Sequence, residues 1–198
     1  MVRTADLVAR MSPAFDQTAG AAPGHALRTC MLAMRLAEAL GIGDRERSSL
    51  FYAALLHEAD GRADLVRQAG LSSEVESGIA AIHERWDGRG SPYRLSGEAI
   101  PLLGRILAVC HELDAASAGG GAQRAMETIH AGSGSAYDPA LTDVLLALCS
   151  HGLLAEAADP ERYRTISDLE PNWLARMADA DEAQRFMALA ASMRAARR

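Results

Sequence analysis

Residues 23–41, PGHALRTCMLAMRLAEALG, carry a strong helical pattern. Pro23 and Gly24 open this segment, and Gly41 is expected to end the helix. The apolar residues between them follow the i, i+3, i+4, i+7 spacing of a single helix face: Leu27, Cys30, Met31 and Met34. The segment therefore predicts one helix that packs against a core.

Helix-start signals recur after this segment. Asp44 is expected to cap a helix whose buried face includes His57. Ser73 and Glu76 have the spacing of a capping box, so a further helix should run from there to about Arg85. The glycine-rich string DGRGSP then breaks the pattern and is expected to form a turn.

The second half of the chain continues the helical pattern. A helix that starts at Pro101 is expected to fray at the glycine triplet 119–121, which we interpret as an internal hinge. Asp138 and Pro139 predict the N-cap and the first residue of a helix that ends near Ser150. No run of alternating β-branched residues appears, so we expect an all-α fold.

Composition is that of an ordinary globular protein. The 198 residues suffice for one core, and 49% of them are hydrophobic and 23% charged. The net charge of −6 repels phosphate backbones, so we expect no nucleic-acid partner. No apolar run reaches the roughly 20 residues that span a bilayer, and no stretch resembles a signal peptide, so we expect no membrane association.

The cysteines indicate a reducing compartment. Cys30, Cys110 and Cys149 are odd in number, lie far apart, and each falls in an apolar run with helical spacing. Such residues are typical of reduced core thiols. We therefore expect a cytoplasmic protein.

Three sequence features contain residues that could ligate a metal ion or take part in catalysis. His25 stands three residues before Arg28. His57 and Glu58 form an adjacent pair late in a predicted buried helix, and His83 begins the string HERWDGRGSP. In their order and surroundings, these motifs resemble the HD-GYP branch of the HD phosphohydrolases.

The resemblance covers roughly residues 22–116 and is most specific in HERWDGRG and in IPLLGRILAV. It implies an HD-domain-like helical bundle with additional C-terminal helices. Residues 1–155 would form the HD-GYP-like helical domain. Residues 156–198 would form a C-terminal helical extension packed on the same core.

The resemblance also implies roles for individual residues. The implied metal ligands are His25, His57, Glu58, His83 and His111. Glu58 and Arg28 would be the catalytic residues, with Arg28 either contacting phosphate or bracing a carboxylate. Imidazole and carboxylate ligands suit Fe, Mn or Zn, and such an ion lowers the pKa of a bound water molecule.

Four positions depart from the family pattern. Glu58 stands where the family has Asp, and His111 stands where it has another Asp. Ser91 takes the Tyr position of the GYP motif, and Ile82 replaces the first His of an HH pair. Because Ile82 cannot ligate a metal, one divalent ion per chain is expected rather than two or three.

These features favour an enzyme that hydrolyses a phosphate ester or a nucleotide-like molecule with the help of a divalent ion. Two alternatives stay open. One is a catalytically inactive HD-like module for sensing, regulation or dimerisation, and the other is an iron-dependent oxidase of the HD type. The expected partner is a small phosphorylated molecule or a regulatory protein, and a homodimer is also left open.

Overall fold

Helices make up most of the computed structural model, which describes residues 1–59, 62–171 and 175–195. The α-helices are α1 (Thr4–Ala19), α2 (His25–Ala39), α3 (Asp44–Leu56), α4 (Arg62–Gln68), α5 (Ser73–Ala80), α6 (Leu102–Gly132), α7 (Pro139–Ser150), α8 (Leu153–Ala157) and α9 (Ala180–Ala195). There are also two 3-10 helices, η1 (Gly97–Ala99) and η2 (Pro160–Leu169). The predicted all-α class is confirmed.

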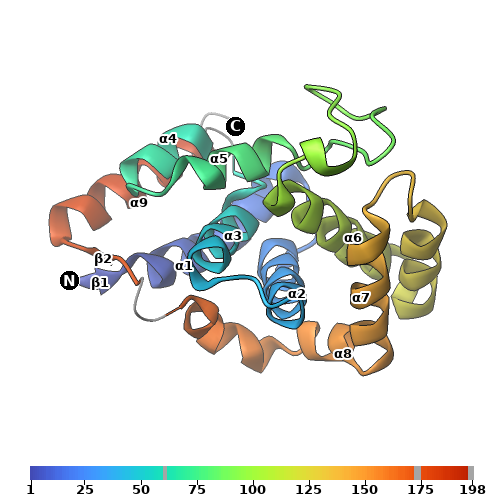
Figure 1. The fold of residues 1–198 in the computed structure, drawn as a ribbon. Helices are drawn as coiled ribbons and strands as arrows, with labels where there is room; N and C mark the ends of the chain where they lie inside the picture. Colours follow the sequence, from blue (N-terminus) through green and yellow to red (C-terminus); the bar gives the residue numbers. More distant parts are fainter. Residues whose placement is uncertain (60–61, 172–174, 196–198) are drawn as a thin grey trace.

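A short strand pair lies at one end of the molecule. β1 (Val2–Arg3) pairs with β2 (Met177–Ala178) in antiparallel register, with Val2 opposite Ala178. Figure 1 shows this pair beside α1 and α9, away from the helices at the centre. The strands thus join the beginning of the chain to the segment that precedes α9.

Helix α2 lies at the centre of the fold, packed against α3 on one side and α6 on the other (Figure 1). Fully buried apolar side chains fill the contacts between these helices, among them Leu32, Leu36, Phe51 and Ile106. Burial of such side chains stabilises the fold by about 1.5–3 kcal/mol each. This packing fixes the start of α2, the end of α3 and the middle of α6 relative to one another.

Helix α1 holds the first turn of α2. Gly24 is the N-cap of α2 and has no side chain that could accept the free N–H groups of this turn. Asp16 of α1, which is fully buried, accepts a hydrogen bond from the N–H of Ala26 at 3.0 Å instead. Burial raises the pKa of Asp16. The residue acts as an N-cap supplied by a different helix.

Two predicted helix starts are wrong in detail. Asp44 is the first residue of α3 rather than its cap, and Gly43 takes the N-cap position. The carboxylate of Asp44 instead accepts a hydrogen bond from Arg47 at 3.3 Å. Ser73 is likewise the first residue of α5, after the N-cap residue Ser72, whose hydroxyl makes no capping bond.

Helix α5 is shorter than predicted. It ends at Ala80 rather than near Arg85, and the chain then turns. The cause is the buried carboxylate of Glu84, which accepts hydrogen bonds from the N–H groups of Tyr93 at 2.6 Å and Leu95 at 3.0 Å. These bonds fold the following loop back onto residue 84. A helix that continued through residue 84 would prevent this turn.

The glycine triplet 119–121 bends α6 but does not end it. Gly121 has φ 79° and ψ 170°, and the helix resumes beyond it to Gly132. The predicted fraying is therefore a kink at the expected place. The prediction for α7 is confirmed, because the carboxylate of Asp138 accepts the N–H of Ala140 at 3.0 Å as an N-cap.

The C-terminal elements η2 and α9 pack against helices from the first half of the chain. η2 contacts α1 and α2, and α9 contacts α1 and α4. Ile166 and Phe186 of these two elements are buried in the core. The boundary expected at residue 155 falls inside α8, so the division into 1–155 and 156–198 stays a prediction. Among the described residues, no helix is long and apolar enough to cross a membrane.

Gly104 allows α6 to lie close against the end of α5. A β-carbon at this position would lie 2.7 Å from that of Ala81 and 3.3 Å from the carbonyl oxygen of Gly78. We expect Gly104→Ala to lower the free energy of unfolding by about 1–3 kcal/mol, measured by urea denaturation. Gly119→Ala is the control in the same helix, because it meets open space and should be neutral or stabilising. Equal values for both variants would contradict the prediction.

Candidate metal centre

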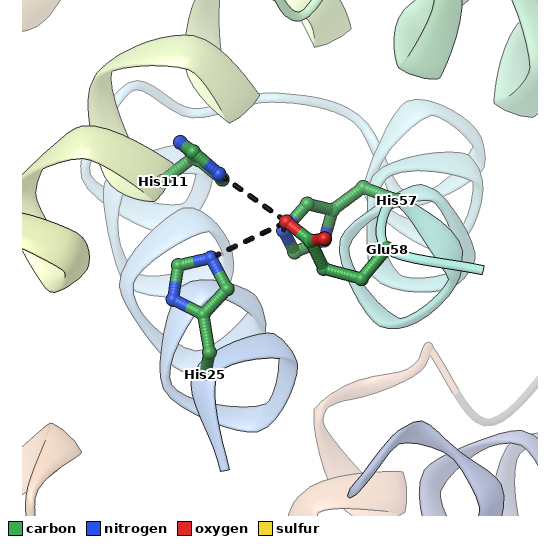
Figure 2. A group of neighbouring side chains, drawn as sticks. All are labelled: His25, His57, Glu58 and His111. Carbon is green, nitrogen blue, oxygen red and sulfur yellow. Dashed lines mark ion pairs between the residues drawn. The ribbon is translucent and has the colours of Figure 1, made fainter. Parts of the chain in front are cut away.

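Four of the predicted ligands meet in one group (Figure 2). His25 is the first residue of α2, His57 directly follows the last residue of α3, and Glu58 comes next. His111 reaches the group from α6. One ligand atom from each of the four side chains lies within 4.8 Å of those of the others. The three helices that pack at the centre of the fold thus bring together residues far apart in the sequence.

The carboxylate of Glu58 lies among the three imidazole rings. Its Oε1 atom is 3.3 Å from Nε2 of His111, 3.4 Å from Nε2 of His57 and 3.8 Å from Nε2 of His25. Figure 2 shows the rings of His25 and His111 turned toward this oxygen. Three nitrogens and one carboxylate oxygen therefore face a common point.

Two of the imidazoles are oriented through their other nitrogen. Nδ1 of His57 lies 2.7 Å from the carbonyl oxygen of Ala54, and Nδ1 of His25 lies 2.6 Å from Oδ2 of Asp114. Because a carbonyl oxygen only accepts hydrogen bonds, Nδ1 of His57 carries the proton, and Nε2 keeps its lone pair. Metal-ligating histidines usually show this arrangement.

The residues present fit a metal ion. Nε2 of His57 is buried and makes no hydrogen bond. A buried polar atom without a partner costs free energy unless another group, such as a metal ion, binds it. Burial also lowers the pKa of His57 and favours the neutral imidazole, which is the form that ligates. Hydrogen bonding by the imidazole of His111 holds the pKa of Glu58 well below its usual range, so this ligand is ionised.

His83 lies beside this group and is not part of it. Its ring centre is 6.4 Å from that of His111, and its side chain is exposed. The neighbouring Ile82 is buried and packs with the core. His83 and His111 line one cavity of about 170 Å³. The candidate centre thus opens toward His83 without including it.

Arg28 does not point its guanidinium at the ligand group. Its Nε and Nη2 atoms donate to the two carboxylate oxygens of Asp114 at 2.6 and 3.1 Å. Two roles were expected for Arg28, contact with phosphate or bracing of a carboxylate. In the structure Arg28 braces the carboxylate of Asp114. Burial opposes ionisation of Asp114, yet hydrogen bonds from His25 and Arg28 outweigh it and hold the pKa of Asp114 below its ordinary value.

The sequence predictions did not include Asp114. One signal was available, since Asp114 stands three residues after His111 and therefore lies on a neighbouring part of the same helix face. Asp16 was also missed, and its role depends on a contact between two helices that no local pattern reveals.

The DGRG string forms the expected turn. The carboxylate of Asp87 accepts the N–H of Arg89 at 3.0 Å and pairs with Arg85 at 2.9 Å. Gly88 has φ 77°, a conformation that glycine adopts easily. The turn is therefore explained by local hydrogen bonds, without a bound substrate.

Comparison with known proteins finds a family match over the middle of the chain. A family model described as HD domain matches residues 60–141. Residues 60–141 of this chain therefore resemble an HD domain. The match contains His83 and His111, whereas His25, His57 and Glu58 precede it. The four-residue ligand group thus joins His111 inside the matched region to three side chains outside it.

A solved structure shows the same fold. The crystal structure of a cyclic GMP-AMP specific phosphodiesterase of V. cholerae, V-cGAP3, superimposes with a TM-score of 0.89 at 21% identity. The similarity covers 99% of this chain and 60% of that chain. The predicted HD-domain-like helical bundle is confirmed.

Three curated relatives of this chain come from Vibrio cholerae. The 3'3'-cGAMP-specific phosphodiesterase 2 is 26% identical over 79% of this chain and 37% of its own. The 3'3'-cGAMP-specific phosphodiesterase 3 is 36% identical over 42% of this chain and 18% of its own. A cyclic di-GMP phosphodiesterase is 40% identical over 41% of this chain and 18% of its own. The predicted resemblance is confirmed, and the chain aligns with less than half of each of these relatives.

Proposed function

We propose that this chain is a metal-dependent phosphohydrolase of the HD type that cleaves a phosphate ester of a nucleotide-like molecule. The observation that carries the proposal is the convergence of three imidazoles and one carboxylate on a common point. Their Nε2 and Oε1 atoms are oriented toward each other by the packing of three helices. The relatives are named as phosphodiesterases of cyclic dinucleotides, which supports a nucleotide-like substrate.

His25, His57, Glu58 and His111 would hold one divalent ion, for which Fe, Mn and Zn are the candidates. Such an ion supplies a water molecule of lowered pKa and neutralises phosphate charge. Glu58 contributes the negative charge of the group, because the neighbouring His111 lowers its pKa. We propose Glu58 as the catalytic residue on this basis.

The substrate would approach from the side of Glu58 and His111. These two side chains are 19% and 25% exposed, whereas those of His25 and His57 are 4% and 1% exposed. The cavity beside His111 lies on the same side, and His83 forms part of its wall. We keep His83 as a proposed ligand from this side, for the ion or for an oxygen of the substrate.

The buried Ile82 supports a site with one ion. A two-ion site stabilises both the attacking and the leaving oxygen of a phosphodiester, and loss of one ion removes one of these contributions. We therefore expect faster turnover of an aryl phosphodiester, which has a good leaving group, than of cyclic di-GMP. Both substrates would be assayed side by side with Mn(II), Fe(II) and Zn(II). Rapid hydrolysis of cyclic di-GMP would show that a second ion is not needed here.

Ile82, which stands where the family has a ligating histidine, also favours one alternative. This alternative is a non-catalytic regulatory or dimerisation module built on the HD scaffold. Metal analysis of the purified protein separates the two functions. About one tightly held ion per chain supports the enzyme, whereas no bound ion together with no turnover supports the module. If iron is found, oxygen consumption by the iron-loaded protein tests for an oxidase.

We also propose a cytoplasmic location. Cys30, Cys110 and Cys149 are free thiols buried in apolar surroundings, as expected for a reducing compartment. A small phosphorylated molecule is the proposed binding partner. A regulatory protein partner and a homodimer remain predictions.

A further inference from the structure

Asp114 occupies a buried position between a candidate metal ligand and an arginine. Its side chain is only 4% exposed, and Oδ2 lies 2.6 Å from Nδ1 of His25. Arg28 binds the same carboxylate at both oxygens, through Nε at 2.6 Å and Nη2 at 3.1 Å. A planar guanidinium that binds both oxygens of a carboxylate fixes its orientation as well as its position.

The arrangement determines which nitrogen of His25 is free. An ionised carboxylate only accepts hydrogen bonds, so Nδ1 of His25 donates to Asp114, and in the neutral imidazole Nε2 is then the nitrogen with the lone pair. That Nε2 atom is the one that faces Glu58. The hydrogen bond therefore sets both the tautomer and the ring orientation that a metal ligand at this position requires.

Arg28 also ties the carboxylate to the start of α2. Its Nη1 atom donates to the carbonyl oxygen of Pro23 at 2.8 Å, two residues before His25. Asp114 belongs to α6, so the three residues connect α6 to the first turn of α2. The three hydrogen bonds that Arg28 donates to Asp114 and Pro23 all serve this connection, and none of the three is directed at the four ligands.

We propose that Asp114, clamped by Arg28, is a positioning residue that presents Nε2 of His25 to the metal ion. The inference rests on the proposed metal site and assigns Arg28 to the same positioning role instead of a direct contact with phosphate. Its consequence is that metal affinity depends on two residues that supply no ligand atom.

The test compares two buried aspartate–arginine pairs, each of which has one member on α6. Asp138 is 6% exposed and accepts a hydrogen bond from Arg105 of α6 at 2.7 Å, away from the four ligands. Asp114→Asn and Asp138→Asn would be titrated with Co(II), whose visible absorption reports the geometry of its ligands. Asp114→Asn is expected to weaken binding by about 10- to 100-fold and to change the spectrum. Asp138→Asn should leave both unchanged while lowering thermal stability.

Two further variants make the result decisive. In a His25→Ala background, Asp114→Asn should cause no additional loss of Co(II) affinity, because the residue acts through that imidazole. Arg28→Lys keeps the charge but not the two-point contact, and should weaken binding even if Asp114→Asn fails to fold. Wild-type affinity and spectrum in Asp114→Asn or Arg28→Lys, or an additive loss in the double variant, would overturn the inference. A wild-type protein that binds no Co(II) would instead overturn the metal site itself.

Discussion

His57→Ala is expected to abolish metal binding and to remove the stabilisation that metal confers. Nε2 of His57 is the most enclosed of the candidate ligand atoms, with its side chain 1% exposed and no hydrogen-bond partner. A ligand that binds only the folded state stabilises it by mass action, by about 4 kcal/mol at a thousand times its Kd. Thermal unfolding with and without added metal, together with metal analysis, measures both effects.

His151→Ala provides the matched control. Nδ1 of His151 lies 2.8 Å from the carbonyl oxygen of Ala147, much as Nδ1 of His57 contacts Ala54. His151 is exposed and lies outside the ligand group. The control should keep the metal content and the metal-dependent shift of the wild type. An unchanged metal content in His57→Ala would refute the assignment of this residue as a ligand.

Glu58→Gln is expected to reduce hydrolysis by about a hundredfold or more. Glu58 supplies the single carboxylate of the four-residue group, and its Oε1 lies within 3.8 Å of all three imidazole Nε2 atoms. An amide can still ligate through its oxygen but has no charge to offer the ion. Loss of one well-placed electrostatic group in an active site commonly lowers kcat by about 10²- to 10³-fold.

The measurement is kcat/KM for an aryl phosphodiester at saturating metal, with the metal content of each variant determined in parallel. Glu58→Asp moves the carboxylate back by one methylene, toward the residue that the family has, and should retain an intermediate rate. Glu112→Gln is the control, since Glu112 lines the cavity beside His111 but lies outside the ligand group. A wild-type rate in Glu58→Gln would exclude Glu58 from the chemistry.

The sequence predicted those helices whose limits depend on local signals. The Asp138 cap of α7 and the apolar face of α2 need only neighbouring residues, and both are as expected. Helix α5 was predicted too long because Glu84 makes its hydrogen bonds to residues 93 and 95, after the chain has turned back. Such a tertiary contact overrides helix propensity and cannot be read from periodicity.

In the candidate site, too, some features were predicted from motifs, whereas others depend on tertiary contacts. The order of the motifs predicted that His25, His57, Glu58 and His111 would converge, and the structure brings them together. The residues that orient them were not predicted, because Asp114 acts on a side chain 89 positions earlier in the chain. Ligands are recognised by residue type and motif, whereas the hydrogen bonds that aim them depend on how distant helices pack.

The burial of Asp16 links the metal centre to a helix that supplies none of its ligands. The carboxylate of Asp16 comes from α1 and binds the N–H of Ala26, the residue next to His25. Docking of α1 on α2 therefore helps to hold the backbone at the first ligand in place. Local opening of α1 and release of an ion from the proposed site would then be coupled equilibria, so conditions that favour one would also favour the other. Metal binding would therefore stabilise the N-terminal helix.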